Sequence, residues 1–541
     1  MNWRTYIIVI LILAATSVVV SNWSARLDLT EDKRYSLSDA TKTLMHEADA
    51  PINIRILLDG HLNPSFLRLK NATIETARDL ARYGTVYYEV SPPDKDEKGI
   101  VSTLSPTIIH ERQQQGQMVQ TPVFPYAILT YKGRQTIVPL LKNTRGLSGE
   151  DNVNQSIEQL EFAFAEAIMQ ITKEKPDKIA FIEGHGELDE RFVYDFQLNL
   201  SKYFQIDRGT FTGNPDDLND YSALIIADPQ EPFSEADKYQ IDHYVMQGGK
   251  ILWLVDGVTF SEDILSKDGF TPVIRKDLNL QDLFFRYGIR ITPTLLQDKQ
   301  CLPIPVDVSR DAEHPNFQPM PWYYAPLLLT SQSSPITHNL GSVSSLFCSG
   351  IEPVGEDDGL YKEVLLATSS ASRAITVPAE VNLSLMSDDD ELFTFAYIPV
   401  GVLVEGTFPS LFRHRMVPEG VTHANENTED TPTRQIFIAC GSIIRNDYQQ
   451  SRPLPLGYDK YTGMQFANKD FLTNAILYLT DNRSIINLRS KDFALRLLND
   501  NAAHAYRTHL QVITCLIPLL ILLITGLCIN ITRYRRAQRG I

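Results

Sequence analysis

Two long apolar runs lie near the two ends of the chain. The first covers residues 6–20 without a charged side chain, and Trp3 and Trp23 bracket it. The second covers residues 510–531 and is also uncharged through its core. A helix needs about 20 apolar residues to cross the hydrocarbon of a bilayer, and tryptophan favours both interfaces. The pattern therefore predicts a transmembrane anchor within residues 1–24 and a second transmembrane helix over 510–531.

The flanking charges predict how these helices are oriented. Four arginines follow the second run within residues 532–541. Because basic residues remain on the cytoplasmic side, both termini are expected in the cytoplasm and the body in the periplasm, with the inner membrane between them. A cleaved signal peptide is the alternative for the first run, with Val19 and Ser21 as the small residues at the cleavage site.

Between the runs, the spacing of apolar positions changes between that of strands and that of helices. After a linker, Ser36 or Ser38 is expected to cap a short helix. The elements that follow are expected to be a strand at 52–58, a helix from Pro64, a strand at 86–90, a hairpin at 126–141 and a long helix at about 154–172. This order resembles a thioredoxin-like fold for residues 25–175, without its dithiol.

A second domain is expected to begin at Pro176. Its predicted strands alternate with helices, which implies right-handed crossovers and a parallel sheet. The predicted strands are 178–182, 221–228, 250–256 and 435–441, with a closing helix at 471–479. The domain is expected to span 176–490, with an irregular insertion at about 260–430. An amphipathic juxtamembrane helix is expected at 491–509.

The charge balance excludes one class of partner. The chain has 66 acidic and 50 basic residues, and its formal net charge is −16. Nucleic-acid binding needs clustered positive charge, so no nucleic-acid partner is expected. The same excess argues against a body lying flat on an anionic bilayer, although not against membrane anchors in contact with lipid.

The five cysteines predict neither a zinc site nor a redox dithiol, because no pair has C-x-x-C spacing. Cys515 and Cys528 lie in the C-terminal apolar run. Cys301, Cys348 and Cys440 can form at most one disulfide, and the compartment alone does not decide whether they pair.

The clearest candidate chemistry follows the strand at 178–182, where Glu183, His185, Glu187 and Asp189 lie close together. Open α/β sheets bind ligands at the carboxyl ends of their strands. A histidine between carboxylates can hold a metal or act as acid and base. A single histidine supplies too few ligands, however, and the spacing matches no metal motif. A solvated loop is the alternative.

Two further positions are expected at the same edge of the sheet. Asp256 ends a predicted strand, and Arg445, Asn446 and Asp447 follow the returning strand. They would form a polar pocket together; local hydrogen bonds and a capped turn are the alternatives. The candidate ligand-binding residues are therefore Glu183, His185, Glu187, Asp256, Arg445 and Asp447. No catalytic residue, metal or cofactor is predicted, and Walker A, G-x-S-x-G and H-E-x-x-H motifs are absent.

The alternation of strands and helices up to residues 248–254, Gly-Gly-Lys-Ile-Leu-Trp-Leu, resembles the class I glutamine amidotransferase-like, flavodoxin-like fold. Intraflagellar-transport proteins and auxiliary proteins of certain ABC transporters share this domain type. The resemblance implies a nucleophilic cysteine after the strand that ends at 255–258. No cysteine stands there, so it implies a scaffold or ligand-binding domain without the hydrolytic site.

Several stretches resemble the GldG family of gliding-motility ABC transporter accessory proteins. They are residues 26–38, 319–327, 335–340, 455–460, 468–475 and 486–490. The resemblance implies a non-catalytic, membrane-anchored periplasmic subunit that works with a polytopic permease and, through it, a cytoplasmic ATPase, in gliding motility and its associated protein secretion. The alternatives are a membrane-tethered carbohydrate-binding or hydrolytic protein and a purely structural envelope protein.

Overall fold

The computed structural model describes residues 36–93, 99–112, 118–142, 149–173, 175–307, 309, 316–355, 359–383, 392–422, 431–481, 486 and 507–538. The predicted N-terminal anchor lies outside the described residues, as does nearly all of the predicted juxtamembrane helix. The chain divides into two compact units, Met1–Lys491 and Asp492–Ile541. The predicted mixed α/β architecture is confirmed for the first unit.

The chain up to residue 173 builds a four-stranded sheet with its own apolar core. Strands β1 and β2 are parallel, and the other neighbours are antiparallel. In spatial order the strands are β2 (Val86–Val90), β1 (Ile52–Ile56), β5 (Tyr126–Tyr131) and β6 (Arg134–Pro139). The helices are α2 (Asp39–Glu47), α3 (Pro64–Leu80), α4 (Gly149–Glu158) and α5 (Leu160–Thr172). A separate hairpin is formed by β3 (Thr107–Arg112) and β4 (Met118–Val123).

Local signals explain where these helices begin. The Ser38 side chain accepts a hydrogen bond from the backbone N–H of Thr41 and caps α2, which settles the choice between Ser36 and Ser38. Asn63 caps α3, with Pro64 at the first helical position. The single helix predicted over 154–172 is wrong. The backbone of Gln159 leaves the helical region, so α4 and α5 are separate.

The second main sheet has ten strands, and its strand order along one path is β15-β16-β19-β22-β23-β10-β9-β7-β8, with β17 paired to β16. The parallel strands are β7 (Lys178–Ile182), β8 (Gln205–Gly209), β9 (Tyr221–Ala227), β10 (Ile251–Leu254) and β23 (Thr433–Ile438). The antiparallel strands are β15 (Cys301–Asp307), β16 (Phe317–Thr330), β17 (Val343–Ser344), β19 (Tyr361–Ala367) and β22 (Pro399–Gly406). The predicted parallel core is thus confirmed.

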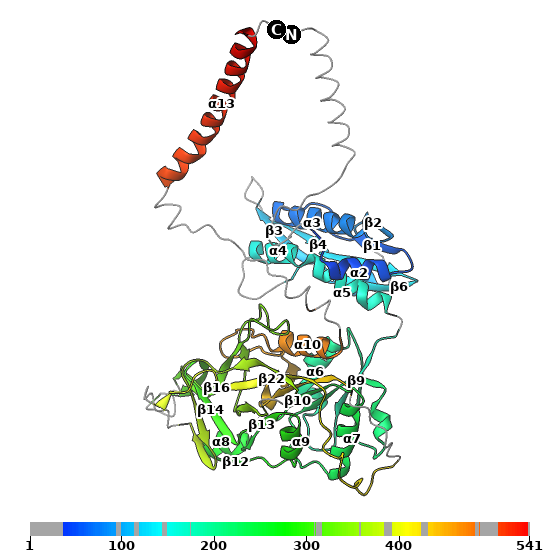
Figure 1. Ribbon diagram of the computed structural model, residues 1–541, viewed down its shortest axis with the longest axis vertical. Coiled ribbons are helices and arrows are strands. Elements are labelled where there is room, and N and C mark those ends of the chain that lie inside the picture. The colour runs from blue at the N-terminus through cyan, green and yellow to red at the C-terminus, as the bar shows by residue number, and fades with distance from the viewer. Residues whose placement is uncertain are drawn as a thin grey trace. The chain divides into compact units, whose positions relative to one another are not determined.

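Helices cover both faces of this sheet. Figure 1 shows α6 (Glu190–Leu200) and α10 (Asn468–Leu479) on one face, with α7 (Glu235–Met246) and α9 (Gln281–Arg286) on the other. Strand β10 is buried along its whole length, as a strand covered on both faces must be. At its centre the indole N–H of Trp253 donates to Gln435 Oε1 at 2.8 Å.

The segment predicted as an insertion, residues 260–430, contributes strands to the main sheet. It supplies β15, β16, β17, β19 and β22, which extend the parallel sheet on the side of β23. It also carries helix α8 (Glu262–Asp268) and most of three small sheets. These are β11 (Val258–Thr259) with β12 (Phe270–Arg275) and β21 (Ala379–Asn382), β13 (Ile289–Ile291) with β18 (Ile351–Pro353), and β14 (Thr294–Asp298) with β20 (Ser372–Thr376). Beyond β23, β24 (Tyr448–Gln449) pairs with β25 (Arg452–Pro453).

A disulfide joins the insertion to the end of the parallel sheet. Cys348 and Cys440 are bonded to each other, with their Cα atoms 4.6 Å apart and a separation of 92 positions in sequence. Both are fully buried. Cys301 is a free thiol.

The C-terminal unit contains α13 (Arg507–Gln538). Its stretch Leu516–Arg535 is long and apolar enough to cross a membrane. This confirms the predicted apolar helix at 510–531 by length and composition, and Pro518 lies inside the helix.

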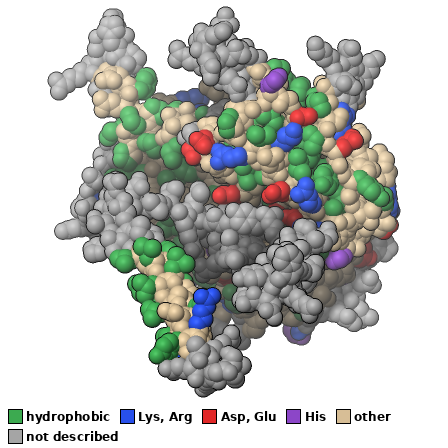
Figure 2. Space-filling view, turned by 90° about the horizontal axis from the view of Figure 1, so that it is seen from above, with side chains coloured by type: hydrophobic (Ala, Val, Ile, Leu, Met, Phe, Trp, Pro, Cys, Tyr) green, Lys and Arg blue, Asp and Glu red, His purple; other side chains and the backbone are tan. Residues whose placement is uncertain are grey.

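The described surface offers no extended basic patch on the face that Figure 2 views. Acidic and basic side chains are interspersed there among apolar ones.

Candidate functional site

Strands β9, β10 and β23 bring three polar positions together at their carboxyl ends. Asp228 follows β9, Asp256 follows β10 and Gly441 follows β23. The backbone N–H of Gly441 donates to Asp256 Oδ1 at 2.7 Å, and Lys276 Nζ lies 2.9 Å from Asp228 Oδ1. Two carboxyl groups therefore share one edge of the sheet with one buried ammonium group.

Glycine is required at position 441. A Cβ atom there would lie 2.5 Å from both Cβ and Cγ of Asp228, which is closer than any stable contact. Asp228 itself adopts a left-handed backbone conformation, with φ at 53°. The close approach of the backbone at Gly441 to Asp228 thus depends on glycine, which has no Cβ atom.

The surroundings of Asp256 strongly shift its pKa. Burial, together with the negative charge of Asp228, raises the pKa of Asp256 to about 8, and this outweighs the opposing effects of Lys276 and the Gly441 N–H. A hydrogen bond between the two carboxyl groups contributes to the same shift. Near neutral pH Asp256 therefore keeps its proton.

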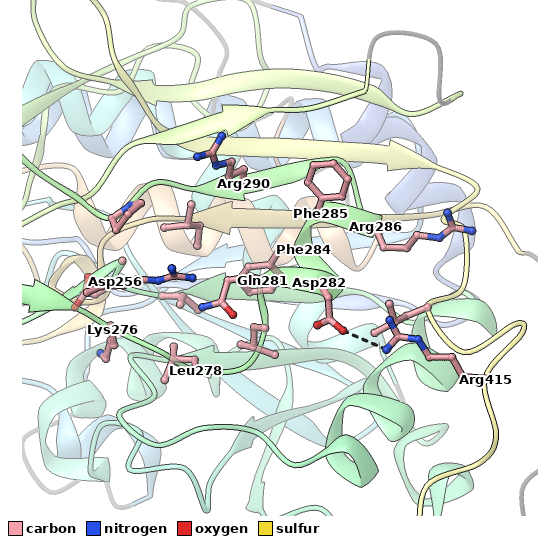
Figure 3. A pocket seen from close by; sticks show the side chains of 17 residues that line it. Asp256, Lys276, Leu278, Gln281, Asp282, Phe284, Phe285, Arg286, Arg290 and Arg415 are labelled. Atoms are coloured by element: carbon pink, nitrogen blue, oxygen red, sulfur yellow. Dashed lines mark hydrogen bonds and ion pairs between the residues drawn. The ribbon is translucent and has the colours of Figure 1, made fainter. Parts of the chain in front are cut away.

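A cavity of about 590 Å³ opens beside Asp256. Figure 3 shows its labelled side chains, with Arg415 paired to Asp282. Its apolar lining includes Leu278, Phe284 and Phe285 from α9 and the segment before it. Five basic residues line it: Arg275, Lys276, Arg286, Arg290 and Arg415. Only two acidic residues do, so this cavity is basic in a strongly acidic chain.

In the predicted cluster around His185, the imidazole is buried and contacts its neighbours. The imidazole stacks on the ring of Phe233 with 3.8 Å between centroids. Its Nδ1 lies 3.3 Å from Glu187 Oε1, and its Nε2 lies 3.3 Å from Asp237 Oδ2. Burial opposes the charged imidazole, but hydrogen bonds to Asp237 and Glu187 outweigh it and raise the pKa of His185 to about 9. Both ring nitrogens have hydrogen-bond partners, so His185, Glu187 and Asp237 together hold the loop after β7 in place.

The other two acidic residues of that cluster have separate partners. Glu183 Oε1 accepts from Arg208 Nε at 2.6 Å. Asp189 caps α6 by accepting from the backbone N–H of Arg191. The structure therefore brings His185 and Glu187 together, while Glu183 and Asp189 make local ion-pair and capping contacts.

Arg445 and Asp447 line a different cavity, of about 190 Å³. Arg445 pairs with Glu262 at 2.9 Å, and Asp447 pairs with Lys460 at 3.3 Å. A short 3-10 helix, η4 (Gly441–Ile444), separates Arg445 from the end of β23. Of the predicted residues, Asp256 thus lines the larger cavity and Arg445 and Asp447 line the smaller one, and ligand binding by either cavity remains a prediction.

Sequence reasoning missed Asp228, Lys276 and most of the basic cavity. Asp228 could have been found from its place at the end of a predicted strand, as Asp256 was. Lys276 and the arginines lie in or beside the irregular insertion, where no periodic pattern indicates which side chains meet.

The described residues show no assembled metal or thiol chemistry. No group of three or more His, Cys, Asp or Glu side chains there could hold a metal ion. Asp256, not a cysteine, stands after β10. Burial and the charge of Asp298 raise the pKa of the Cys301 thiol to about 11, which makes it a poor nucleophile.

Comparisons with known proteins place these features in a family. An uncharacterized protein of Borreliella burgdorferi is 22% identical over 534 residues, which cover 95% of this chain and 94% of that protein. A solved structure entitled mmIFT52 N-terminal domain is 14% identical, covers 56% of this chain and 97% of its own, and superposes with a TM-score of 0.32. Residues 31–130 match a domain of unknown function (DUF7088). Residues 176–475, more than half of the chain, match the family model described as ABC-type uncharacterized transport system, and the chain therefore belongs to this family of ABC transport auxiliary components.

Proposed function

We propose that this protein is a non-catalytic, membrane-anchored accessory subunit of an ABC transporter, with its folded body in the periplasm. The observation that carries the proposal is the family match over residues 176–475, which contains the whole parallel sheet. Helix α13 supplies a membrane anchor. The thioredoxin-like and amidotransferase-like descriptions of the two sheets, and the domain bounds at residues 175 and 490, belong to the same proposal.

The disulfide supports a body outside the cytoplasm. Disulfides persist in oxidising compartments such as the periplasm and are rare in the cytosol. Cys348 and Cys440 are bonded within the core of the ten-stranded sheet. The arginines after the apolar part of α13 support a cytoplasmic C-terminus.

A polytopic permease and a cytoplasmic ATPase are the proposed partners. The sequence has no Walker A motif, so the energy for transport comes from another subunit. Gly526 has open space where a side chain would stand, and the Thr525 hydroxyl is satisfied by the Ile521 carbonyl of its own helix. Small residues of this kind let two transmembrane helices approach closely. A role in gliding motility rests on the resemblance to the GldG family.

The arrangement of the carboxyl groups supports a non-enzymatic role over the hydrolytic alternative. Asp228 and Asp256 are hydrogen-bonded to each other. Glycoside hydrolysis by two carboxyl groups requires a separation of about 5 Å or more, which leaves space for the sugar or for water.

Co-purification tests the partnership. Affinity purification of the full chain in mild detergent is expected to recover a polytopic membrane protein together with an ATPase, identified by quantitative mass spectrometry. Gly526→Leu is expected to reduce that recovery about fivefold, because a large side chain blocks close helix packing. Leu523→Ile on the same helix is the matched control and keeps recovery unchanged. Absence of any enriched polytopic protein contradicts the proposal.

Thiol labelling of spheroplasts tests the topology. In a background with Cys301, Cys515 and Cys528 replaced by serine, a Lys267→Cys variant is expected to react with a membrane-impermeant maleimide, because Lys267 is an exposed residue of the body. An Arg539→Cys variant is expected to react only after permeabilisation. Cys348 and Cys440 are expected to react only after reduction and unfolding. Labelling of the tail before permeabilisation would reverse the proposed orientation.

A further inference from the structure

We propose that the 590 Å³ cavity beside Asp256 binds a small organic anion, one that carries a phosphate or carboxylate group on an apolar body. The inference deepens the proposed function by naming the ligand class that an accessory subunit holds on the outer side of the membrane, and its biological meaning rests on that function. The binding itself is a property of this cavity alone.

The charges of the cavity lining favour an anion. Three of its five basic side chains already have partners. Lys276 pairs with Asp228, Arg415 pairs with Asp282, and Arg290 pairs with Glu352.

Arg275 and Arg286 differ from these three. Among the described residues, no ion pair joins either of them to an acidic side chain, although the charge of Arg275 is felt by the nearby Asp277. Two guanidinium groups beside one cavity are therefore available to a negatively charged ligand. Arginine suits this task because its planar fork binds phosphate and carboxylate groups through two hydrogen bonds.

The acidic members of the lining do not cancel this charge. Asp282 is committed to Arg415 and to the buried Lys238 Nζ, which lies 2.8 Å from Asp282 Oδ1. Asp256 keeps its proton near neutral pH, since its pKa is raised to about 8 by burial and by the charge of Asp228. The net field at the cavity is consequently positive, although the whole chain carries a formal charge of −16.

The apolar part of the lining favours a ligand that is more than a bare ion. Leu278, Phe284 and Ile291 contribute apolar side chains to the cavity. Phe285, which is 64% exposed, adds an aromatic ring to this lining that a bound ligand could cover. The volume lies within the range of about 300–1,000 Å³ typical of small-molecule sites. A charged group at the arginines and an apolar body against the phenylalanines would fill it.

Three probes separate charge from apolar contact. We would use the full chain in nanodiscs of zwitterionic phosphatidylcholine and measure binding by calorimetry. The probe 2-naphthyl phosphate has both features, 2-naphthol has the apolar part only, and inorganic phosphate has the charge only. The first is expected to bind at least about tenfold more tightly than either of the others, and more weakly as salt rises.

Two variants locate the site. Arg275→Gln with Arg286→Gln is expected to weaken 2-naphthyl phosphate binding about tenfold while leaving 2-naphthol binding unchanged. Gln281→Trp, at an exposed lining position, narrows the cavity and is expected to weaken binding of both naphthyl probes at least about tenfold. The matched control is Lys267→Gln with Arg452→Gln, which removes two exposed positive charges that do not line the cavity and keeps affinity unchanged.

Equal affinity for 2-naphthyl phosphate and 2-naphthol would overturn the proposal. Unchanged affinity in the arginine double variant, with a native melting temperature, would do so as well. If that variant fails to fold, retained binding in folded Gln281→Trp has the same consequence. These outcomes are independent of the accessory role. Loss of the transporter partner in co-purification, with probe binding intact, refutes that role alone.

Discussion

Asp242→Ala is expected to lower the free energy of unfolding of the folded body by about 3 kcal/mol, one of the largest effects of any single substitution in the second sheet domain. The Asp242 carboxylate lies on α7 and is 2% exposed. It accepts hydrogen bonds from the Tyr287 hydroxyl at 2.8 Å, the Ser410 hydroxyl at 2.6 Å and the Leu411 backbone N–H at 3.1 Å.

The physical reason is that three donors would lose their acceptor in a buried place. Each buried donor without a partner costs about 1–3 kcal/mol, and partial entry of water offsets some of this. Tyr287 follows α9, and Leu411 lines the basic cavity. The same substitution is therefore expected to loosen both walls of the cavity and to weaken 2-naphthyl phosphate binding together with stability.

Urea unfolding followed by tryptophan fluorescence measures the effect, because Trp253 is buried in this core. Tyr287→Phe removes one donor and is expected to cost about 1 kcal/mol. Asp268→Ala, at an exposed position on α8, is the matched control and is expected to change stability by less than about 0.5 kcal/mol. A loss equal to that of the control would show that the carboxylate does not join these three segments.

Asp256→Asn is expected to raise stability by about 5 kcal/mol at pH 8 and to leave it nearly unchanged at pH 4. Burial and the charge of Asp228 raise the pKa of Asp256 from 3.8 to about 8. The native protein therefore keeps a proton that the unfolded chain releases. Stability from this group is fully present below pH 4 and falls as the pH rises through 8.

Asparagine at position 256 removes this loss of stability with rising pH, because it does not titrate. Its side-chain oxygen can still accept the hydrogen bond that Gly441 donates, and its NH₂ group can donate to Asp228 as the protonated carboxyl does. Stability curves at pH 4, 6 and 8 measure the effect, with the variant flatter than the wild type.

Asp277→Asn is the control for this comparison. Hydrogen bonds from the backbone of Asn279 and the side chain of Gln281 lower the pKa of Asp277, so this group titrates in acid only. Its replacement is expected to leave the slope between pH 5 and pH 8 unchanged. If Asp256→Asn kept the slope of the wild type, the pH dependence of stability would have to come from a group other than Asp256.

Local patterns predicted the elements that depend on neighbours in sequence. The strand at 178–182 and the helix capped by Ser38 follow from periodicity and one capping side chain, and both are confirmed. The break at Gln159 was missed because it interrupts a pattern that is apolar on both sides. The insertion was predicted only as an irregular segment, and the place of its strands in the main sheet was not predicted.

The sequence by itself determined the apolar C-terminal helix, the alternation of strands and helices, and the absence of a cysteine after β10. These depend on residue type and on spacing over a few positions. Only the tertiary structure decided that Asp256 meets Gly441, 185 positions away, and that Lys276 meets Asp228. It also placed Arg445 and Asp447 in another cavity. The reason is physical: charges interact through space, and the chain segments that carry them are brought together only by the packing of the sheet and its insertion.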